Sequence, residues 1–302
     1  MASLLELKKA LDEEGEWLLA RKVLVLGKPK SGKTVLAATV AKSPSIKNVY
    51  FFDMENGIES VLTHGALSDS ELDKITYIPI KDTHEYPLAA ETLLKCFTAM
   101  PTKPVNLCTK HGKVGCPKAD CANDRIKFSL ASLGVDSAVI VDSGSQLASS
   151  ILSLEMKTET YKDLRKYYGA FTIEMDAILS GIQAAECTVI MVTHIIDIMS
   201  KPDDPKTTPK LLEHAPLFGS QNYSRNKGGK YFGWTLLCEQ RNGKYLVGSS
   251  PKFRTKCELG NRAGVQIEDY PEFDMSWIFK PVKSWPEPKA GSTGPAIKLG
   301  KS

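Results

Sequence analysis

A short stretch rich in glycine and lysine lies near the start of the chain. Residues 27–34 read Gly-Lys-Pro-Lys-Ser-Gly-Lys-Thr, which is the spacing G-x-x-x-x-G-K-T. This spacing predicts a phosphate-binding loop, because glycines let backbone N–H groups approach a triphosphate closely at the start of a helix. In such a loop Lys33 places a positive charge on the β- and γ-phosphates, and the Thr34 hydroxyl binds Mg²⁺.

The residues on both sides of the loop favour this prediction. The preceding run Lys22–Leu26 is short, apolar and largely β-branched, which is typical of a strand buried on both faces, and residues 35–41 predict a helix. Strand, loop and helix in this order are the setting that the motif requires. We therefore expect ATP and Mg²⁺ as cofactors. The nucleotide-binding residues would be Gly27, Lys28, Pro29, Lys30, Ser31, Gly32, Lys33 and Thr34.

Two acidic residues follow the next predicted strand. The apolar run Lys47–Phe52 ends in Asp53, and Glu55 lies two positions later. In open α/β sheets the carboxyl ends of the strands form the edge that binds ligands, and residues two apart on an extended chain point the same way. One of these acids can polarise the water that attacks the γ-phosphate. The alternative is a solvated turn that ends at Gly57.

A third acid ends another apolar run. Residues 136–141 predict a buried strand, and Asp142 stands at its tip. A carboxylate in this position downstream of a phosphate-binding loop is typical of the residue that holds Mg²⁺, directly or through water. We expect Asp142 to share the ion with Thr34.

Four potential metal ligands are crowded into the middle of the chain. They are Cys108, His111, Cys116 and Cys121. Three thiolates and one imidazole form a closed tetrahedral set, which is typical of structural zinc. Metal binding would also supply folding energy to a segment that is too polar to order itself by apolar burial. The alternative is a group of reduced cysteines in a flexible loop. Lysines between the ligands would offer a stiffened loop for phosphate contacts: Lys110, Lys113 and Lys118.

Composition bounds the class of protein. The chain has 302 residues, 42% of them hydrophobic, which is enough for one large α/β domain. No apolar run is long enough for a membrane span and the N-terminus lacks a signal-peptide pattern, so we expect a cytoplasmic protein with no membrane partner. The net charge of +4 is uneven: residues 201–256 hold eleven Lys or Arg against four Asp or Glu, and residues 101–130 hold six against two. Such basic segments favour a polyanionic partner.

Several of these segments resemble the RecA-type ATPases over roughly residues 20–260. The resemblance rests on the phosphate-binding loop, on Phe51–Asn56 and on Asp142–Leu147, and it is nearest to the short RecA-like ATPases of bacteriophages that include single-strand annealing proteins. It implies an α/β fold: a RecA-like P-loop NTPase core whose mostly parallel, twisted sheet is flanked by helices. To this core we expect a C-terminal antiparallel hairpin around Asn242-Gly243 and the Cys/His-rich insertion to be added.

The resemblance also implies roles for particular residues. Glu55 would be the catalytic glutamate, acting with Lys33, and Thr193 and His194 at the end of the strand 187–194 would sense the γ-phosphate. For His194 the alternative is a neutral histidine that caps a strand end. Residues 197–230 would form a mobile DNA-binding loop with Arg225, Lys227 and Lys230, and with Tyr223, Tyr231 and Phe232 as stacking surfaces or as anchors of the loop. Lys252 and Arg254 would reach the ATP site of a neighbouring subunit.

The domain organisation follows from these assignments. We expect an N-terminal helix over 1–19, an ATPase domain over 20–280 and a disordered tail over 281–302. Within the domain we expect the zinc-binding insertion over residues 101–130 and a third strand over 75–80. We also expect amphipathic helices over 86–99 and 161–185. The hypothesis is an ATPase that binds single-stranded DNA, acts in phage-type recombination or strand annealing in the host cytoplasm, and assembles into a homo-oligomeric ring or filament. The alternatives are a DnaB-type helicase core and a nucleotide-gated DNA-binding module with little turnover.

Overall fold

A computed structural model describes residues 21–83, 85–158, 164–200, 209–226, 228–249, 259–261 and 274–279. The predicted N-terminal helix over 1–19 and the tail over 281–302 lie outside these ranges. The same holds for Lys227, Lys252 and Arg254, so the structure does not test their predicted roles.

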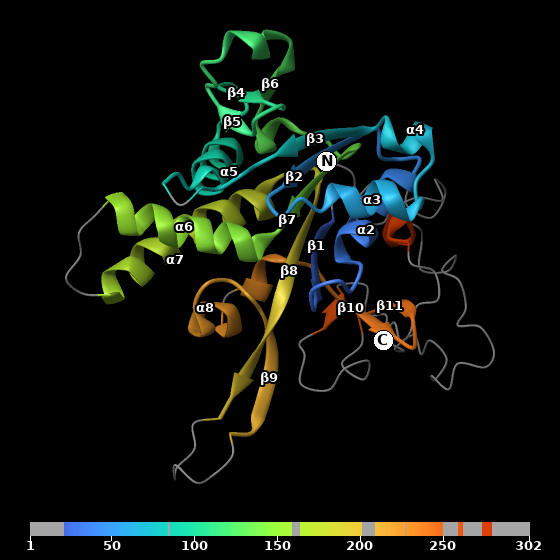
Figure 1. Ribbon diagram of the computed structural model, residues 1–302, viewed down its shortest axis with the longest axis vertical. Coiled ribbons are helices and arrows are strands. Elements are labelled where there is room, and N and C mark those ends of the chain that lie inside the picture. The colour runs from blue at the N-terminus through green and yellow to red at the C-terminus, as the bar shows by residue number, and fades with distance from the viewer. Residues whose placement is uncertain are drawn as a thin grey trace, which may run out of the picture.

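The described residues form a nine-stranded sheet in the order β11-β10-β1-β8-β7-β2-β3, with β9 paired to β8 and β12 to β10. Neighbouring strands from β10 to β3 are parallel, which confirms a mixed α/β fold with a mostly parallel sheet (Figure 1). The bounds are β1 Lys22–Gly27, β2 Asn48–Asp53, β3 Ile75–Pro79, β7 Ser137–Asp142, β8 Thr188–Met199, β9 Leu211–Pro216, β10 Trp234–Arg241, β11 Lys244–Gly248 and β12 Gly260–Asn261.

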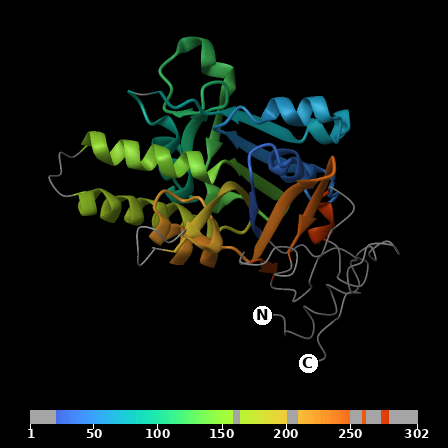
Figure 2. The ribbon, with the colours of Figure 1, turned by 60° about the horizontal axis from the view of Figure 1, so that its bottom comes forward.

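Helices cover both faces of the sheet, because the apolar side chains of each strand alternate between them. In β1, Val23 and Val25 pack on the face covered by α2, whereas Leu24 and Leu26 face the core under α5, α6 and α7 (Figure 2). The bounds are α2 Lys33–Ala38, α3 Ile58–His64, α4 Asp69–Leu72, α5 Leu88–Thr98, α6 Gly144–Thr158, α7 Leu164–Ala184 and α8 Gln221–Asn226. The sheet is thereby buried on both sides around β1, β8, β7 and β2.

The C-terminal part of the sheet agrees with the predicted hairpin. β10 and β11 are antiparallel and joined by Asn242 and Gly243, whose φ angles of 50° and 76° suit a two-residue hairpin turn. A short 3-10 turn, Ser276–Phe279, packs beside it, and Trp277 contacts Trp234 edge to face at 6.0 Å. Residues 274–279 therefore belong to the core of the domain.

The described part of residues 197–230 forms strands and short helices rather than the single irregular loop that the sequence predicted. β8 continues to Met199 and pairs antiparallel with β9, so the two strands form an arm that projects from the sheet at the bottom of Figure 1. The helix α8 and the 3-10 turn Gly228–Tyr231 follow. Elements of six residues or fewer are too short to give a clear periodic signal, which is why these were not found from the sequence.

The Cys/His-rich insertion carries a small sheet of its own at the opposite end of the molecule (Figure 1). Its antiparallel strands are β4 Val105–Cys108, β5 Lys113–Val114 and β6 Arg125–Phe128. Phe128 joins the main core, where the centre of its ring lies 5.3 Å from that of Phe52 and 5.2 Å from that of Tyr50. The Thr92 hydroxyl of α5 donates to the Gly112 carbonyl at 2.7 Å. The insertion is therefore anchored to the domain rather than loosely attached.

Among the described helices, none is long and apolar enough to cross a membrane.

Candidate nucleotide-binding and metal-binding sites

Strand register gathers the predicted site residues at one edge of the sheet. Gly27 at the end of β1 pairs with His194 of β8, and Asp53 of β2 pairs with Asp142 of β7. Gly27, Asp53 and Asp142 are the last residues of their parallel strands, and His194 lies level with them in β8, which continues to Met199. The sequence therefore placed the loop and the acids correctly relative to one another.

The loop at residues 27–34 is closely packed and has left-handed backbone at two positions. Lys30 and Gly32 have φ angles of 62° and 86°, and a Cβ on Gly27 would lie 2.3 Å from Ser31 Oγ. Lys33 is 6% exposed, and its Nζ donates to the Lys28 carbonyl at 2.8 Å. Burial lowers the pKa of Lys33, although Asp142 and Glu55 partly oppose the shift. The ammonium group is thus held within the curl of the loop.

Features of the loop fit an anionic phosphate group. Ser31 Oγ is buried and has no hydrogen-bond partner among the described residues. A cleft of about 300 Å³ lies beside it, lined by Lys28, Lys30 and Gln240 among others. A buried hydroxyl without a partner is costly unless a ligand or water satisfies it. These donors therefore suit the phosphates of a nucleotide.

Thr34 and Asp142 supply oxygen atoms for a hard cation. The Thr34 hydroxyl donates to Asp142 Oδ2 at 2.5 Å. Asp142 is 2% exposed, and burial raises the pKa of its carboxyl to about 7 despite the hydrogen bond from Thr34. Gly57 presses against this pair, because a Cβ there would lie 2.6 Å from Asp142 Oδ2. A hydroxyl and a carboxylate side by side are the oxygen ligands that Mg²⁺ prefers.

Asp53 and Glu55 have different surroundings. Asp53 is 2% exposed, and its carboxylate accepts the backbone N–H groups of Glu55, Gly57 and Ile58 at 3.1, 2.9 and 3.0 Å. The Tyr77 hydroxyl adds a longer contact of 3.3 Å. The three backbone bonds fix the loop that follows β2, and the Tyr77 hydroxyl joins Asp53 to β3. The Asp53 carboxylate is therefore buried and occupied by these bonds, whereas Glu55 is exposed.

The Glu55 side chain reaches across the edge to β7 and β8. Its Oε1 accepts a hydrogen bond from the Ser143 hydroxyl, and its Oε2 lies 3.3 Å from His194 Nε2. Burial raises the pKa of Glu55, but the hydrogen bonds from His194 and Ser143 and the charge of Lys33 outweigh burial and lower it below the usual value. Glu55 is therefore an ionised acceptor at neutral pH.

Of the two residues predicted as a sensor, His194 lies beside this glutamate, whereas the Thr193 hydroxyl contacts Ser145 instead. Thr193 Oγ1 is buried at 2.8 Å from Ser145 Oγ, and the His194 backbone N–H donates to the same Ser145 oxygen at 2.9 Å. His194 Nδ1 is buried without a hydrogen-bond partner within the described part of the chain. Ser143 and Ser145 were not identified from the sequence, although both directly follow the Asp142 strand tip.

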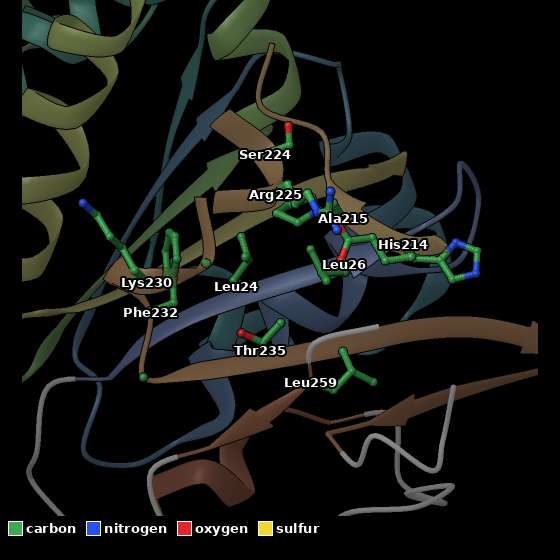
Figure 3. A pocket seen from close by; sticks show the side chains of 14 residues that line it. Leu24, Leu26, His214, Ala215, Ser224, Arg225, Lys230, Phe232, Thr235 and Leu259 are labelled. Carbon is green, nitrogen blue, oxygen red and sulfur yellow. The ribbon is translucent and has the colours of Figure 1, made fainter. Parts of the chain in front are cut away.

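The two described residues predicted to bind DNA, Arg225 and Lys230, do not line the cleft beside the phosphate-binding loop. Arg225 and Lys230 line a cavity of about 380 Å³ between β1, β9 and α8 (Figure 3). Arg225 Nε lies 2.5 Å from a carboxylate oxygen of Glu213, and Lys230 Nζ sits 4.6 Å from the centre of the Tyr231 ring. Both cations thus have partners within the fold, and the Arg225 side chain is 51% exposed.

The three aromatic side chains of this region are anchors. Tyr223, Tyr231 and Phe232 are 3, 6 and 7% exposed, and both tyrosine hydroxyls donate to Asp176 at 2.7 Å. Rings this deeply buried have no free face on which a base could stack. Of the two interpretations given for these aromatics, the structure supports the anchoring one.

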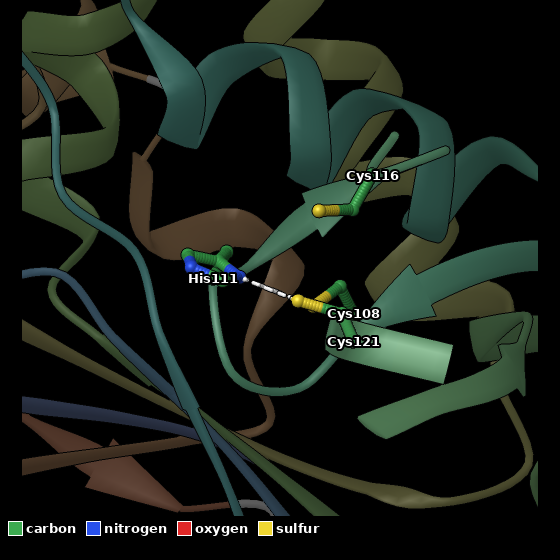
Figure 4. A group of neighbouring side chains, drawn as sticks. All are labelled: Cys108, His111, Cys116 and Cys121. Carbon is green, nitrogen blue, oxygen red and sulfur yellow. Dashed lines mark hydrogen bonds between the residues drawn. The ribbon is translucent and has the colours of Figure 1, made fainter. Parts of the chain in front are cut away.

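The Cys/His cluster is assembled as its spacing predicts. The ligand atoms of Cys108, His111, Cys116 and Cys121 all lie within 4.8 Å of one another (Figure 4). His111 Nδ1 faces the sulfurs, at 3.1 Å from Cys121 Sγ and 3.6 Å from Cys108 Sγ. Tetrahedral zinc with bonds of ~2.3 Å places sulfurs ~3.8 Å apart, so the cluster needs to contract by no more than about 1 Å. The donor set therefore fits zinc.

Comparisons with known proteins add a limited likeness of fold. No family model matches the sequence, and no curated protein matches it. An ATPase from the type III secretion system of pathogenic bacteria is similar at 12% identity and a TM-score of 0.42, over 74% of this chain and 52% of the ATPase. The chain thus spans about half the length of that protein. The RadB recombinase is similar at 16% identity and a TM-score of 0.36, over 83% of this chain and 92% of the recombinase. Values this low leave the activity to be argued from the residues themselves.

Proposed function

We propose that this protein binds ATP with Mg²⁺ and hydrolyses the γ-phosphate. The observation that carries the proposal is the meeting of Lys33, the Thr34–Asp142 pair and Glu55 at one sheet edge. An ammonium group, a magnesium-type oxygen pair and an ionised carboxylate are the three parts that phosphoryl transfer to water requires.

Each part has a defined task in the proposed reaction. Lys33 stabilises negative charge on the phosphates, and the buried Ser31 hydroxyl gains a phosphate partner. Bound Mg²⁺ would neutralise charge on the β- and γ-phosphates, with Thr34 and Asp142 as its protein ligands. Glu55 orients and polarises the attacking water, while the hydrogen bonds from Ser143 and His194 fix its carboxylate. His194 connects Glu55 to β8, which suits a sensor of the bound γ-phosphate.

We also propose that the Cys/His cluster holds a structural zinc ion and that single-stranded DNA is the partner, in recombination or strand annealing by a homo-oligomer. The zinc proposal is supported by the converged ligand atoms. The DNA and oligomer proposals are supported by the RecA-type resemblance and by the basic segments 101–130 and 201–256.

Phosphate release with a Glu55→Gln variant tests the ATPase proposal. The amide keeps the size of the side chain but loses the negative charge, so we expect turnover to fall about 10²-fold or more while ATP binding persists. Glu59→Gln is the matched control, because Glu59 is an exposed acid in the first turn of α3. Equal turnover in wild type and Glu55→Gln would refute the assigned role, and absence of ATP binding by wild type would refute the proposed function.

A further inference from the structure

We propose that a groove between β3 and the Cys/His-rich insertion binds single-stranded nucleic acid, with lysines contacting the phosphates and an apolar floor contacting the bases. This inference rests on the proposed function, because it locates the polyanionic partner of the ATPase. It places that partner on a different surface from Arg225 and Lys230.

The groove has a volume of about 610 Å³ and is basic. Its charged lining residues are all cations: Lys81, Lys110, Lys113 and Lys118. Lys110 contacts Asp120 at 3.4 Å, but the two side chains are 51 and 65% exposed, so a phosphate can replace this weak surface pair. Among the described residues that line the groove, none is Asp or Glu. Such a lining complements a phosphate backbone.

The floor of the groove suits unpaired bases. By floor we mean the apolar and aromatic lining residues of the groove, which are Tyr77, Pro79, Tyr86, Leu88 and Pro117. Single strands expose flat apolar base faces that pack on rings of this kind, whereas a duplex hides them inside its stack. Lys113 Nζ lies 4.8 Å from the centre of the Tyr86 ring, which fixes one phosphate-binding group against the floor. A peptide with acidic side chains would satisfy the lysines but would leave this floor without a partner.

The two walls of the groove are held in fixed positions. A Cβ on Gly112 would lie 2.2 Å from the Pro79 carbonyl oxygen, so the insertion touches the end of β3 backbone to backbone. The hydrogen bond from Thr92 to the Gly112 carbonyl ties the same turn to α5. His111 and Cys116 belong both to the groove and to the metal cluster. Zinc would therefore stiffen the wall that carries the lysines.

The groove also borders the nucleotide site. Pro79 pairs with Asp53 in the sheet, and the Tyr77 hydroxyl lies 3.3 Å from Asp53 Oδ2. Asp53 in turn holds the loop of Glu55 through backbone N–H groups. A nucleic-acid strand bound on Tyr77 would act through Asp53 on the loop that carries Glu55. We therefore expect the bound nucleic acid to change the rate of ATP hydrolysis.

The test measures the affinity of the full-length protein for a labelled oligo-dT strand by fluorescence anisotropy, with Mg²⁺ and a non-hydrolysable ATP analogue present. The variants replace both Lys81 and Lys113 with Glu, or both with Gln. Lys103→Glu is the control, since Lys103 is exposed in the same basic segment but does not line the groove. Folding is followed by thermal melting, zinc content and ATP affinity.

The association constant falls as salt concentration rises, and each phosphate contact with a single strand contributes ~0.7 to the steepness of that fall on a log–log plot. We expect the double Gln variant to reduce this steepness by about 1.4. At physiological salt this corresponds to an affinity about tenfold weaker, with a larger loss for the double Glu variant and none for Lys103→Glu. If the double Glu variant fails to fold, the slope of the Gln variant decides.

Wild-type affinity in the double variants, or no binding of oligo-dT by wild type, would overturn the groove assignment. ATP binding and turnover decide the proposed function independently of this result. A duplex that binds as tightly as the single strand, or polyglutamate that displaces the strand equally well, would overturn the assignment of single-stranded nucleic acid.

Discussion

Replacing Gly57 by alanine should damage the magnesium-binding pair without straining the backbone. Gly57 has φ and ψ angles of −70° and −18°, which alanine adopts readily. Its added Cβ would lie 2.6 Å from Asp142 Oδ2 and 2.7 Å from Thr34 Cγ2. Contacts this short require Thr34 or Asp142 to move by several tenths of an ångström or more.

The expected magnitude follows from the cost of overpacking a buried site. Such insertions cost about 1–3 kcal/mol. If that cost appears in the affinity for Mg²⁺ in the presence of nucleotide, the affinity falls about 5- to 150-fold. Mg²⁺ is sensitive to this displacement because it demands near-ideal octahedral geometry.

The same substitution at Gly169 provides the control. A Cβ there would meet nothing within 4 Å, and Gly169 lies inside α7 in its second turn. Alanine is a better helix former than glycine, so Gly169→Ala should raise the free energy of unfolding by about 0.5–1 kcal/mol. Urea denaturation and Mg²⁺ titration of the nucleotide-bound protein measure both variants. Wild-type Mg²⁺ affinity in Gly57→Ala would refute the placement of Gly57 against the Thr34–Asp142 pair.

Three further changes have defined outcomes. Asp53→Ala leaves three backbone N–H groups without their acceptor, so we expect it to lower the free energy of unfolding by about 2–4 kcal/mol. Tyr77→Phe removes one long hydrogen bond and should lower the free energy of unfolding by about 1 kcal/mol or less. Urea denaturation compares the two variants, and equal effects would contradict the account of Asp53. Cys108→Ser should lower the zinc bound per chain in metal analysis, and Cys96→Ser, outside the cluster, should not; equal, near-zero zinc in wild type and Cys108→Ser would exclude the metal site. Burial and the neighbouring Glu155 raise the pKa of Glu174 from 4.5 to about 7, so ionisation is less favourable in the folded state and stability is lost as pH rises through this range. Glu174→Gln should remove that loss. Denaturation curves at pH 5 and pH 8 measure it, and an equal loss of stability in wild type and Glu174→Gln would contradict the prediction.

Local patterns in the sequence were sufficient to predict the elements that carry the chemistry. The phosphate-binding loop, the apolar strands and the acids at their ends follow from spacing over a few residues, and parallel pairing then brings Gly27, Asp53 and Asp142 to one edge. The hairpin at Asn242-Gly243 was predictable for the same reason, since its turn requires residues that tolerate positive φ. The Cys/His cluster needs only a short segment to close on itself.

Features that depend on tertiary packing were not predictable. The helix α6 was missed because it holds several serines, which favour turns and caps over helix interiors, although Leu147, Ile151 and Leu154 follow helical spacing. The contact of His194 with Glu55 joins residues far apart in the chain. The burial of Tyr223 and Tyr231 depends on Asp176 of α7, which no local pattern indicates as their partner.

Calorimetric titration of a non-hydrolysable ATP analogue in Mg²⁺ tests the central claim most directly, with wild type compared to Lys33→Ala. If the nucleotide lies at the carboxyl edge of the sheet, wild type should bind it and the variant should lose at least about tenfold in affinity, because removing the buried ammonium costs upwards of ~1.4 kcal/mol. Equal binding by both proteins, or none by wild type, would contradict the claim.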